Sequence, residues 1–316
     1  MQHLILYISY YSSRQAVREK GVCPVSIFYK HLLMDWLVKD LELSNYSDTP
    51  SLFDKDGTAY KTFGDEPATL IFIHGVGMCG EIWQPQVEYF SKDYRVITYD
   101  FLGHGQSELK KDKLTLEDYV TQLYNLVNEI GVSNFSLIGH SMGAIIAVAY
   151  ALRYPKKVDT LIPINIVFKR TKKAQDDVIM RAKDVFKSQQ ITNISQTLER
   201  WFKNKTSPYD LLKINNVRSW LHNTPPKAYA EAYYLFATSD RVFANNLSNL
   251  EPPVLYLTGS EDPNSTSLMS EQMAQQSPNS SSESIKGEAH MMAYISAEKV
   301  NPIIEHFLNN TNNTTT

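Results

Sequence analysis

The sequence predicts an α/β protein with a mostly parallel central sheet, helices on both faces of the sheet and a helical cap insertion. Short β-rich runs alternate with helical runs from residue 69 to residue 165, a pattern typical of a parallel sheet covered by helices. The alternation then stops, because residues 169–244 contain helical segments and no clear strand, and a strand pattern resumes at residue 253. An insertion between two strands can cover their carboxyl ends, where open α/β sheets bind ligands.

The expected strands are short apolar or β-branched runs bounded by polar residues. They cover residues 69–73, 94–99, 135–138, 158–162, 253–258 and 282–286. Between them, apolar residues recur with a helical period over residues 116–130 and stop at Gly131. Thr115 precedes this helix and Asp118 follows three residues later, which is the pattern of an N-cap.

We expect one large core built from residues 34–168 and 245–309, with residues 169–244 as the helical cap. Residues 1–33 are interpreted as an uncertain N-terminal extension upstream of an internal start at Met34. Their basic residues and few acids are also compatible with an organelle-targeting peptide. Residues 310–316 are polar and of low complexity, and we expect a disordered tail there.

The most informative motif is Gly139-His140-Ser141-Met142-Gly143, which lies between the apolar runs 134–138 and 144–152. The motif predicts a sharp strand-to-helix turn that presents the Ser141 Oγ to a cleft, with the two glycines relieving the crowding. The turn also sets the serine at a helix N-terminus, where free N–H groups stabilise developing negative charge. We therefore predict Ser141 as a nucleophile, provided that the chain supplies its partners.

A serine nucleophile needs a base and an acid that orients the base, and on this fold the chain order is Ser, acid, His. Asp262 follows directly after a predicted strand and is the expected acid. Its neighbour Glu261 is the alternative, interpreted as a solvated loop charge. His290 follows the last predicted strand and is the expected general base, because His222 lies in the cap and His306 in the terminal helix.

An oxyanion hole on this fold takes the N–H after the nucleophile and one from the loop after an early strand. Met142 supplies the first, and Val76 in the glycine-rich loop of residues 74–78 is the expected second donor. His74 and His140 flank these loops and are interpreted as structural hydrogen-bonding residues.

Taken together, these motifs resemble the α/β-hydrolase superfamily, in particular its lid-bearing serine esterases and lipases. The resemblance covers about residues 40–310 and rests on the order of its parts. Those parts are His74-Gly75, the segment 100–107, the Ser141 turn, the Gly259-x-x-Asp262 turn and the late His290. The resemblance implies that residues 100–107 form a structural loop beside the pocket.

The resemblance implies hydrolysis of a carboxylic ester, a lactone or a thioester through an acyl-enzyme, without a metal or an organic cofactor. Ser141 argues against haloalkane dehalogenases and epoxide hydrolases, which use Asp at that position. Two alternatives stay open: a C–C bond hydrolase with the same three residues, and a hydrolase-like ligand sensor. C–C bond hydrolases often carry a Trp after the catalytic His, whereas this chain has Met291.

The composition of this 316-residue chain limits the kinds of partner that we expect it to bind. A net charge of −3 gives no case for a nucleic acid or an anionic membrane, and the apolar run 4–8 is too short to span a bilayer. Cys23 and Cys79 lack metal-type spacing, so a cytoplasmic setting is expected and Cys79 is interpreted as a small buried residue. The expected partner is a small-molecule ester, and the aromatic residues of the cap suggest an apolar moiety. The oligomeric state cannot be read from the sequence.

Overall fold

The computed structural model describes residues 44–312. The chain divides into two compact units, Met1–Ser47 and Asp48–Thr316. Of the first unit, residues 44–47 are described, and they lie in helix α3 (Ser44–Asp48). The predicted extension, residues 1–33, lies outside the described residues, as do residues 34–43 of the predicted core and residues 313–316.

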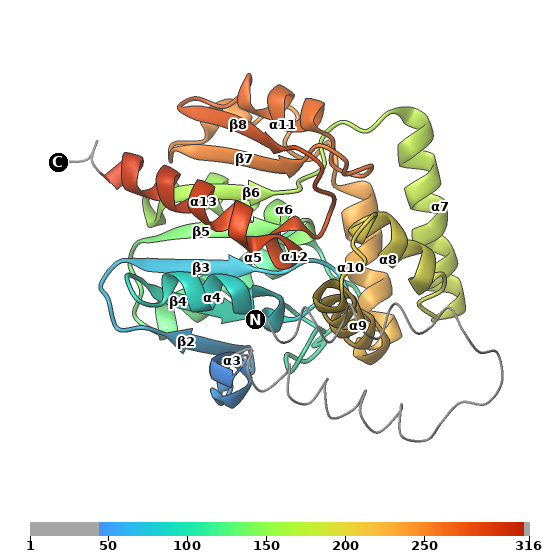
Figure 1. The fold of residues 1–316 in the computed structure, drawn as a ribbon, viewed down its shortest axis with the longest axis horizontal. Helices are drawn as coiled ribbons and strands as arrows, with labels where there is room; N and C mark the ends of the chain where they lie inside the picture. The colour runs from blue at the N-terminus through green and yellow to red at the C-terminus, as the bar shows by residue number, and fades with distance from the viewer. Residues whose placement is uncertain (1–43, 313–316) are drawn as a thin grey trace, which may run out of the picture. The chain divides into compact units, whose positions relative to one another are not determined.

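The described part of the second unit contains an eight-stranded sheet with the order β1-β2-β4-β3-β5-β6-β7-β8 (Figure 1). Strands β1 and β2 join antiparallel at one edge, whereas all pairs from β4 to β8 are parallel. The predicted mostly parallel sheet is therefore confirmed. The strands are β1 (Leu52–Phe53), β2 (Ala59–Phe63), β3 (Thr69–Ile73), β4 (Arg95–Tyr99), β5 (Phe135–His140), β6 (Val158–Ile164), β7 (Val254–Gly259) and β8 (Ser280–Ile285).

The central strands explain why the sequence pattern is readable. Every residue of β3, β5 and β7 is buried, and these strands read as continuous runs rather than alternating ones. That is the signature of parallel strands with both faces covered. Strand β1 has only two residues, both exposed, and the polar residues Lys61 and Thr62 interrupt β2, which is why the sequence did not predict them.

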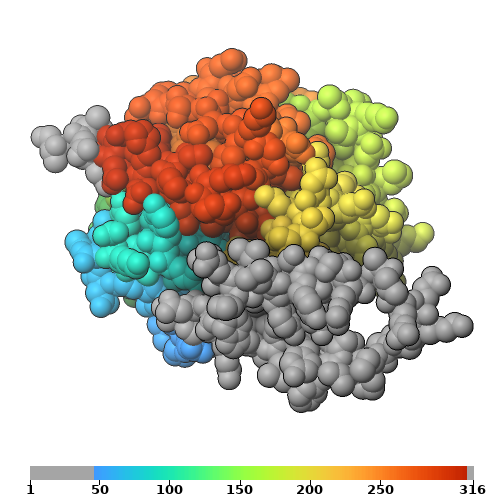
Figure 2. Space-filling model, in the orientation of Figure 1, coloured from blue at the N-terminus to red at the C-terminus, as the bar shows by residue number. Residues whose placement is uncertain are grey.

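Helices cover both faces of the sheet, as expected. Figure 1 shows α4 and α13 on one face and α5 and α6 on the other. In Figure 2 the segments of α4 and α13 form adjacent parts of one surface, where the Tyr89 hydroxyl donates to Glu305 at 2.8 Å. The helices of this unit are α4 (Gln84–Phe90), α5 (Leu116–Glu129), α6 (Met142–Arg153), α7 (Lys172–Ser188), α8 (Ile194–Phe202), α9 (Pro208–Asn223), α10 (Pro226–Thr238), α11 (Ser267–Ala274), α12 (Met292–Ile295) and α13 (Ala297–Asn312).

Helix α5 begins where the sequence predicts it. The Asp118 carboxylate accepts a hydrogen bond from the Thr115 main-chain N–H at 2.7 Å, which satisfies a donor that the helix leaves unpaired. Its apolar stripe is buried, and the helix ends at Glu129, one residue before the predicted end.

Helices α7 to α10 occupy the segment between β6 and β7 for which the sequence predicts a cap; we refer to residues 169–244 as the insertion. Figure 1 shows these helices gathered at the end of the sheet toward which the parallel strands point. Within the insertion, α7 packs against α10. Ligand sites of open α/β sheets lie at that end, so the insertion is positioned to form one wall of a site.

The C-terminal helix corrects one prediction. Helix α13 continues to Asn312, so residues 310–312 of the predicted disordered tail are helical. The Thr311 hydroxyl donates to the Phe307 carbonyl at 3.1 Å, so this polar residue bonds into the last turn although it adds no apolar surface. Among the described residues, no helix is both long and apolar enough to cross a lipid bilayer.

Candidate active site

Ser141 is the single residue between β5 and α6. Its φ of 57° and ψ of −113° lie in a region that residues with a side chain rarely adopt, and such strain costs about 1–3 kcal/mol. The turn is held on both sides: the Ser141 N–H donates to the Ile164 carbonyl at 2.9 Å, and its carbonyl accepts from the Ala144 N–H at 3.1 Å. The strained serine is thus fixed by its surroundings.

The two glycines of the motif allow the close approach of β3, β5 and α6. A Cβ on Gly143 would lie 2.2 Å from the Ile73 carbonyl oxygen, and a Cβ on Gly139 would lie 2.3 Å from the Gly143 oxygen. Both contacts involve main-chain atoms that have no freedom to rotate away. Glycine is therefore required at both positions, as the motif predicts.

Ser141, His290 and Asp262 come together at the carboxyl ends of the strands. The His290 Nε2 lies 3.2 Å from the Ser141 Oγ, and its Nδ1 lies 2.7 Å from the Asp262 Oδ2. All three side chains are buried. Because a carboxylate only accepts, His290 donates its Nδ1–H to Asp262, and its Nε2 lone pair faces the serine hydroxyl. The structure thus joins the three predicted residues in one hydrogen-bonded chain, while their catalytic roles stay predictions.

Asp262 is held in its charged form. Burial alone would raise its pKa, but the electrostatic interaction and the hydrogen bond with His290, together with further donors, outweigh that effect and leave the pKa below its ordinary value. The Asn264 main-chain N–H reaches the second carboxylate oxygen at 2.8 Å. The alternative acid, Glu261, instead lies 3.3 Å from the Lys203 ammonium group and is partly exposed.

Asn165 is a positioning residue that the sequence reading missed. It follows β6 directly, its φ is 52°, and its side-chain amide donates to the Asp262 Oδ2 at 2.7 Å. The Ser265 hydroxyl donates to its carbonyl at 2.7 Å, which fixes the backbone. The predicted strand ends at residue 162, whereas β6 continues to Ile164 and places Asn165 at its carboxyl end. The signal that could have found it is a polar residue directly after a strand that neighbours β5.

His74 and His140 support the loops around Ser141, as expected. His74 donates its Nδ1–H to the Gly75 carbonyl at 2.8 Å and accepts from the Phe101 N–H at 3.1 Å. His140 donates its Nε2–H to the His290 carbonyl at 2.8 Å. Burial holds the pKa of His74 well below its usual range, and burial together with the nearby His290 lowers that of His140 to about 3. Both are therefore neutral.

The main-chain N–H groups of the two expected oxyanion donors are free of hydrogen bonds to other described residues. Neither the Val76 nor the Met142 main-chain N–H donates a hydrogen bond to another described group. Met142 opens the twelve-residue helix α6, and Val76 lines the same pocket as Ser141. Free N–H groups at a helix start and in a glycine-rich loop are suited to bind an oxyanion.

The segment 100–107 is structural, as the resemblance implies. The Asp100 carboxylate accepts from the Gly80 N–H at 2.7 Å and from the Gln106 N–H at 2.9 Å. The Ser107 hydroxyl donates to the Asp100 carbonyl at 2.6 Å and accepts from the Ala59 N–H at 2.9 Å. These side chains hold the main chain, and none of them lines the pocket.

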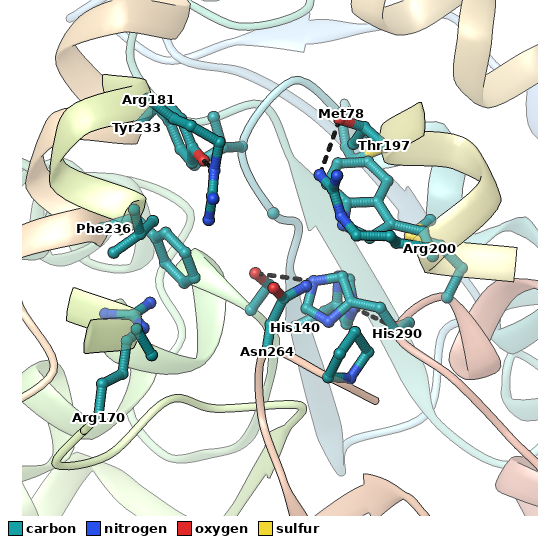
Figure 3. Close-up of a pocket in the computed structure, with 18 of the residues that line it drawn as sticks. Met78, His140, Arg170, Arg181, Thr197, Arg200, Tyr233, Phe236, Asn264 and His290 are labelled. Carbon is teal, nitrogen blue, oxygen red and sulfur yellow. Dashed lines mark hydrogen bonds between the residues drawn. The ribbon is translucent and has the colours of Figure 1, made fainter. Parts of the chain in front are cut away.

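A pocket lies between the strand ends and the insertion (Figure 3). The sheet contributes Ser141, His290 and the loop around Val76. The insertion contributes three arginines and four of the aromatic residues noted in the sequence: Arg170, Arg181, Arg200, Trp201, Tyr229, Tyr233 and Phe236. Helix α8 meets the His290 segment directly, because the Trp201 and His290 rings lie 5.5 Å apart and the Met291 N–H donates to the Trp201 carbonyl at 3.2 Å.

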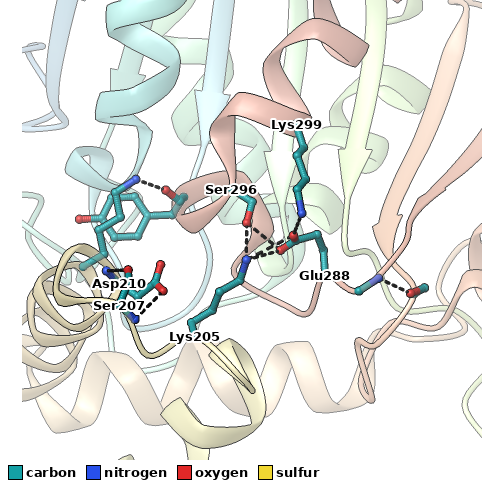
Figure 4. A network of polar contacts seen from close by, with 10 residues as sticks. Lys205, Ser207, Asp210, Glu288, Ser296 and Lys299 are labelled. Carbon is teal, nitrogen blue, oxygen red and sulfur yellow. Dashed lines mark hydrogen bonds and ion pairs between the residues drawn. The ribbon is translucent and has the colours of Figure 1, made fainter. Parts of the chain in front are cut away.

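A buried carboxylate, Glu288, anchors the segment that carries His290 (Figure 4). Its side chain accepts from Ser296 at 2.7 Å, pairs with Lys205 of the insertion at 3.0 Å, and pairs with Lys299 of α13. Its carbonyl accepts from the Glu261 N–H at 2.8 Å. Burial would raise the pKa of Glu288, but these donors hold it below its ordinary value. One side chain thus ties the insertion, α13 and the His290 loop together.

Residues 68–296 match the family model of the alpha/beta hydrolase fold. The chain belongs to the alpha/beta hydrolase family. The matched residues include the serine turn, most of the parallel sheet and the helical insertion. The resemblance to α/β-hydrolases that the motifs indicate is therefore confirmed. This family assignment supports a hydrolase activity.

Named relatives agree with the alpha/beta hydrolase assignment. The chain is 37% identical over 273 residues to (E)-2-((N-methylformamido)methylene)succinate hydrolase of Acinetobacter baylyi. The aligned region covers 86% of this chain and 98% of the relative. It is 28% identical over 207 residues to 3-oxoadipate enol-lactonase 1 of the same species, covering 65% of this chain and 76% of the relative. A malate-bound thermophilic esterase from Thermogutta terrifontis matches the fold with a TM-score of 0.73 at 24% identity, covering 83% of this chain and 98% of the esterase.

Proposed function

We propose that this chain is a serine hydrolase that cleaves a carboxylic ester, or the related lactone or thioester, through an acyl-enzyme. The observation that carries the proposal is the hydrogen-bonded chain from the Ser141 Oγ to the His290 Nε2 at 3.2 Å and from the His290 Nδ1 to Asp262 at 2.7 Å. This geometry matches what a serine nucleophile, its base and the acid that orients the base require.

In the proposed first half-reaction, His290 takes the proton of the Ser141 hydroxyl at Nε2 while the Oγ attacks the substrate carbonyl carbon. Asp262 stabilises the imidazolium that forms. The oxyanion of the tetrahedral intermediate binds the N–H groups of Val76 and Met142. The bond to the leaving group then breaks, the imidazolium protonates the departing oxygen or sulfur, and the acyl group stays on Ser141.

In the second half-reaction, a water molecule attacks the acyl carbon and gives its proton to His290. The same two N–H groups stabilise the second oxyanion. The bond between the acyl carbon and the Ser141 Oγ breaks, and His290 returns its proton to that oxygen. A carboxylic acid leaves, and the starting state is restored.

A second candidate is hydrolysis of a formamide by the same attack. The relative from A. baylyi has a formamido group in the name of its substrate, and it is 37% identical over nearly its whole length. The C–C bond hydrolase and the ligand sensor use the same pocket. Turnover of a ring-fission dienoate without cleavage of simple esters would favour the C–C reaction, and at most one turnover per molecule would favour the sensor.

The test of the proposed function is the turnover of short p-nitrophenyl esters by Ser141→Ala. We expect turnover to fall by about 10⁴-fold or more, with the thermal transition retained. Ser270→Ala is the matched control, because Ser270 in α11 is also buried and its hydroxyl has no partner among the described residues. Activity of Ser141→Ala within severalfold of the wild type would contradict the proposal.

A further inference from the structure

The wall that the insertion contributes to the pocket is cationic. Figure 3 shows Arg170 and Arg181 on one side of the pocket and Arg200 on the other side, where His290 also lies. They come from three places in the chain: the connection before α7, the middle of α7, and α8. The one carboxylate among the pocket-lining residues is Asp177.

Arg170 is a buried cation without a hydrogen-bond partner for its terminal nitrogens. Its side chain is 4% exposed, and neither Nη1 nor Nη2 donates to any described group. The nearest acid, Asp240, lies 3.9 Å from Nη1 and already accepts from the Arg170 main-chain N–H and from Gln175. The guanidinium lies over the Phe236 ring at 4.7 Å. Buried donors without an acceptor are costly, so these two nitrogens call for an acceptor that enters the pocket.

The other two arginines lack an ionic partner within 4.0 Å among the described residues. The Arg181 Nε donates to the Tyr233 hydroxyl at 3.4 Å, and an Arg200 Nη2 donates to the Thr197 hydroxyl at 3.2 Å. A long contact to a neutral hydroxyl leaves the charge of a guanidinium available to a ligand. Burial lowers the pKa of Arg170 although Asp240 raises it, and the positive charge of Arg181 lowers it further. An anion between them would relieve both effects.

We propose that Arg170 and Arg181 form a carboxylate-binding subsite, so that the hydrolase acts on substrates that carry a carboxylate in addition to the bond that is cleaved. The inference rests on the proposed function and names its substrate class. The planar fork of Arg170 matches a carboxylate with two parallel hydrogen bonds. The aromatic side chains Trp201, Tyr229 and Phe236 then contact the carbon chain between the carboxylate and the reacting carbonyl.

The A. baylyi relative agrees with this substrate class, because the name of its substrate is that of a succinate, a dicarboxylate. The assignment for the present chain depends on its own residues, above all on the unpartnered buried donors of Arg170. Binding through this subsite also orients the substrate, since a carboxylate fixed at the insertion leaves the carbonyl free to meet Ser141.

The experiment measures binding rather than turnover, so that it stands apart from the test of Ser141. In the Ser141→Ala protein, calorimetry compares 4-oxopentanoate with 2-pentanone and 5-oxohexanoate with 2-hexanone. Each pair has the same carbon number and the same carbonyl, and the carboxylate is replaced by a methyl group. We expect the keto acid of each length that fits to bind at least tenfold more tightly than its ketone.

Variants in the same background identify the subsite. Arg181→Met and Arg170→Lys are expected to weaken keto-acid binding tenfold or more and to leave ketone binding within about twofold. Lys173→Met is the matched control: it removes the same charge from the same helix at an exposed position outside the pocket. Arg170→Lys keeps the buried charge, which protects the fold while it removes the fork.

Two results would overturn the inference: equal affinity for both members of each pair, or keto-acid affinity in both arginine variants equal to that of Lys173→Met. Neither result bears on the proposed chemistry, because Ser141 is already alanine in these proteins. Conversely, ester turnover that survives the Ser141→Ala substitution would contradict the proposed function, while keto-acid binding would remain measurable.

Discussion

The strand ends and the insertion border the same pocket with different kinds of residues. Ser141, Asp262 and His290 are buried and bonded to each other, and the central strands beneath them are buried throughout. Helix α7 buries only three of its seventeen residues, and its Arg181 is exposed. Reacting groups need fixed positions, and these come from a closely packed core. Selection of the substrate depends on a more open layer that can change without disturbing the chemistry.

This comparison has a measurable consequence. Substitutions at the strand ends should lower kcat, because they remove interactions made in the transition state, whereas substitutions of the pocket arginines should act first on binding. Glu288 lies where the two layers meet, so its substitution should change the free energy of unfolding. The variants below test the division from the largest expected effect to the smallest.

Asp262→Asn should lower kcat by about 10³–10⁴-fold. The amide leaves the shape intact, but it removes the charge that stabilises the imidazolium of His290 and can favour the wrong tautomer of the ring. Steady-state kinetics with a p-nitrophenyl ester measures the change. Glu261→Gln is the matched control, since this neighbouring carboxylate contacts Lys203; comparable losses in both variants would contradict the assignment.

The pH dependence follows from the pKa of Asp262. In the folded protein this pKa is lowered, so the paired carboxylate contributes stability that is present above the ordinary Asp pKa and is lost as the pH falls through the lowered folded value. Asp262→Asn should lose that dependence. Thermal unfolding of both proteins from neutral to acidic pH measures it, and parallel curves across the range would count against the charged form.

Asn165→Ala should lower kcat by about 10–100-fold, because a hydrogen bond to a charged group contributes about 1.5–3 kcal/mol. With one donor to the Asp262 Oδ2 removed, the pKa of Asp262 should rise, and the acid limb of the rate profile should move to higher pH. Asn264→Ala is the comparison, since Asn264 bonds Asp262 through its main-chain N–H. If the acid limb of the Asn165→Ala rate profile is unchanged, the proposed effect of Asn165 on Asp262 is contradicted and Asn165 has a structural role alone.

Glu288→Gln should lower the free energy of unfolding by about 1–3 kcal/mol, since charge-assisted hydrogen bonds to Lys205 and Lys299 weaken. The pKa of Glu288 is lowered in the folded protein. The loss of unfolding free energy in the variant should therefore be largest above the ordinary Glu pKa, and it should shrink as the pH falls through the folded value. Urea unfolding at two pH values measures it. Glu283→Gln, at an exposed position of β8, should change little; an equal effect of both variants would argue against the anchor.

The parts of the fold that the sequence predicts are those whose pattern follows from burial. Strand β3 matches its predicted bounds because four apolar residues in a row after Thr69 need two covered faces. Ser141 is predictable because a strained turn between a strand and a helix restricts its neighbours to glycine. Asp262 and His290 follow from chain order, since parallel strands end at one edge of the sheet.

Other parts depend on contacts that no local pattern encodes. Strand β1 is only two residues long, and the polar residues Lys61 and Thr62 interrupt β2. Asn165 donates to Asp262, which is 97 positions away in the sequence. This contact exists only because β6 and β7 are neighbours in the sheet. Arg170 and Arg181 look like ordinary surface charges in the sequence. Only the fold shows that they line one pocket and that the terminal nitrogens of Arg170 have no acceptor among the described residues.

The most direct test of the central claim is the site at which a fluorophosphonate probe reacts with the wild-type protein. Mapping of the labelled peptides by mass spectrometry should find one adduct, on Ser141, and none in Ser141→Ala. Labelling should be at least about 100-fold slower in His290→Gln, because the base that removes the hydroxyl proton is lost. An adduct on another residue, or equal labelling rates in the wild type and His290→Gln, would contradict the account.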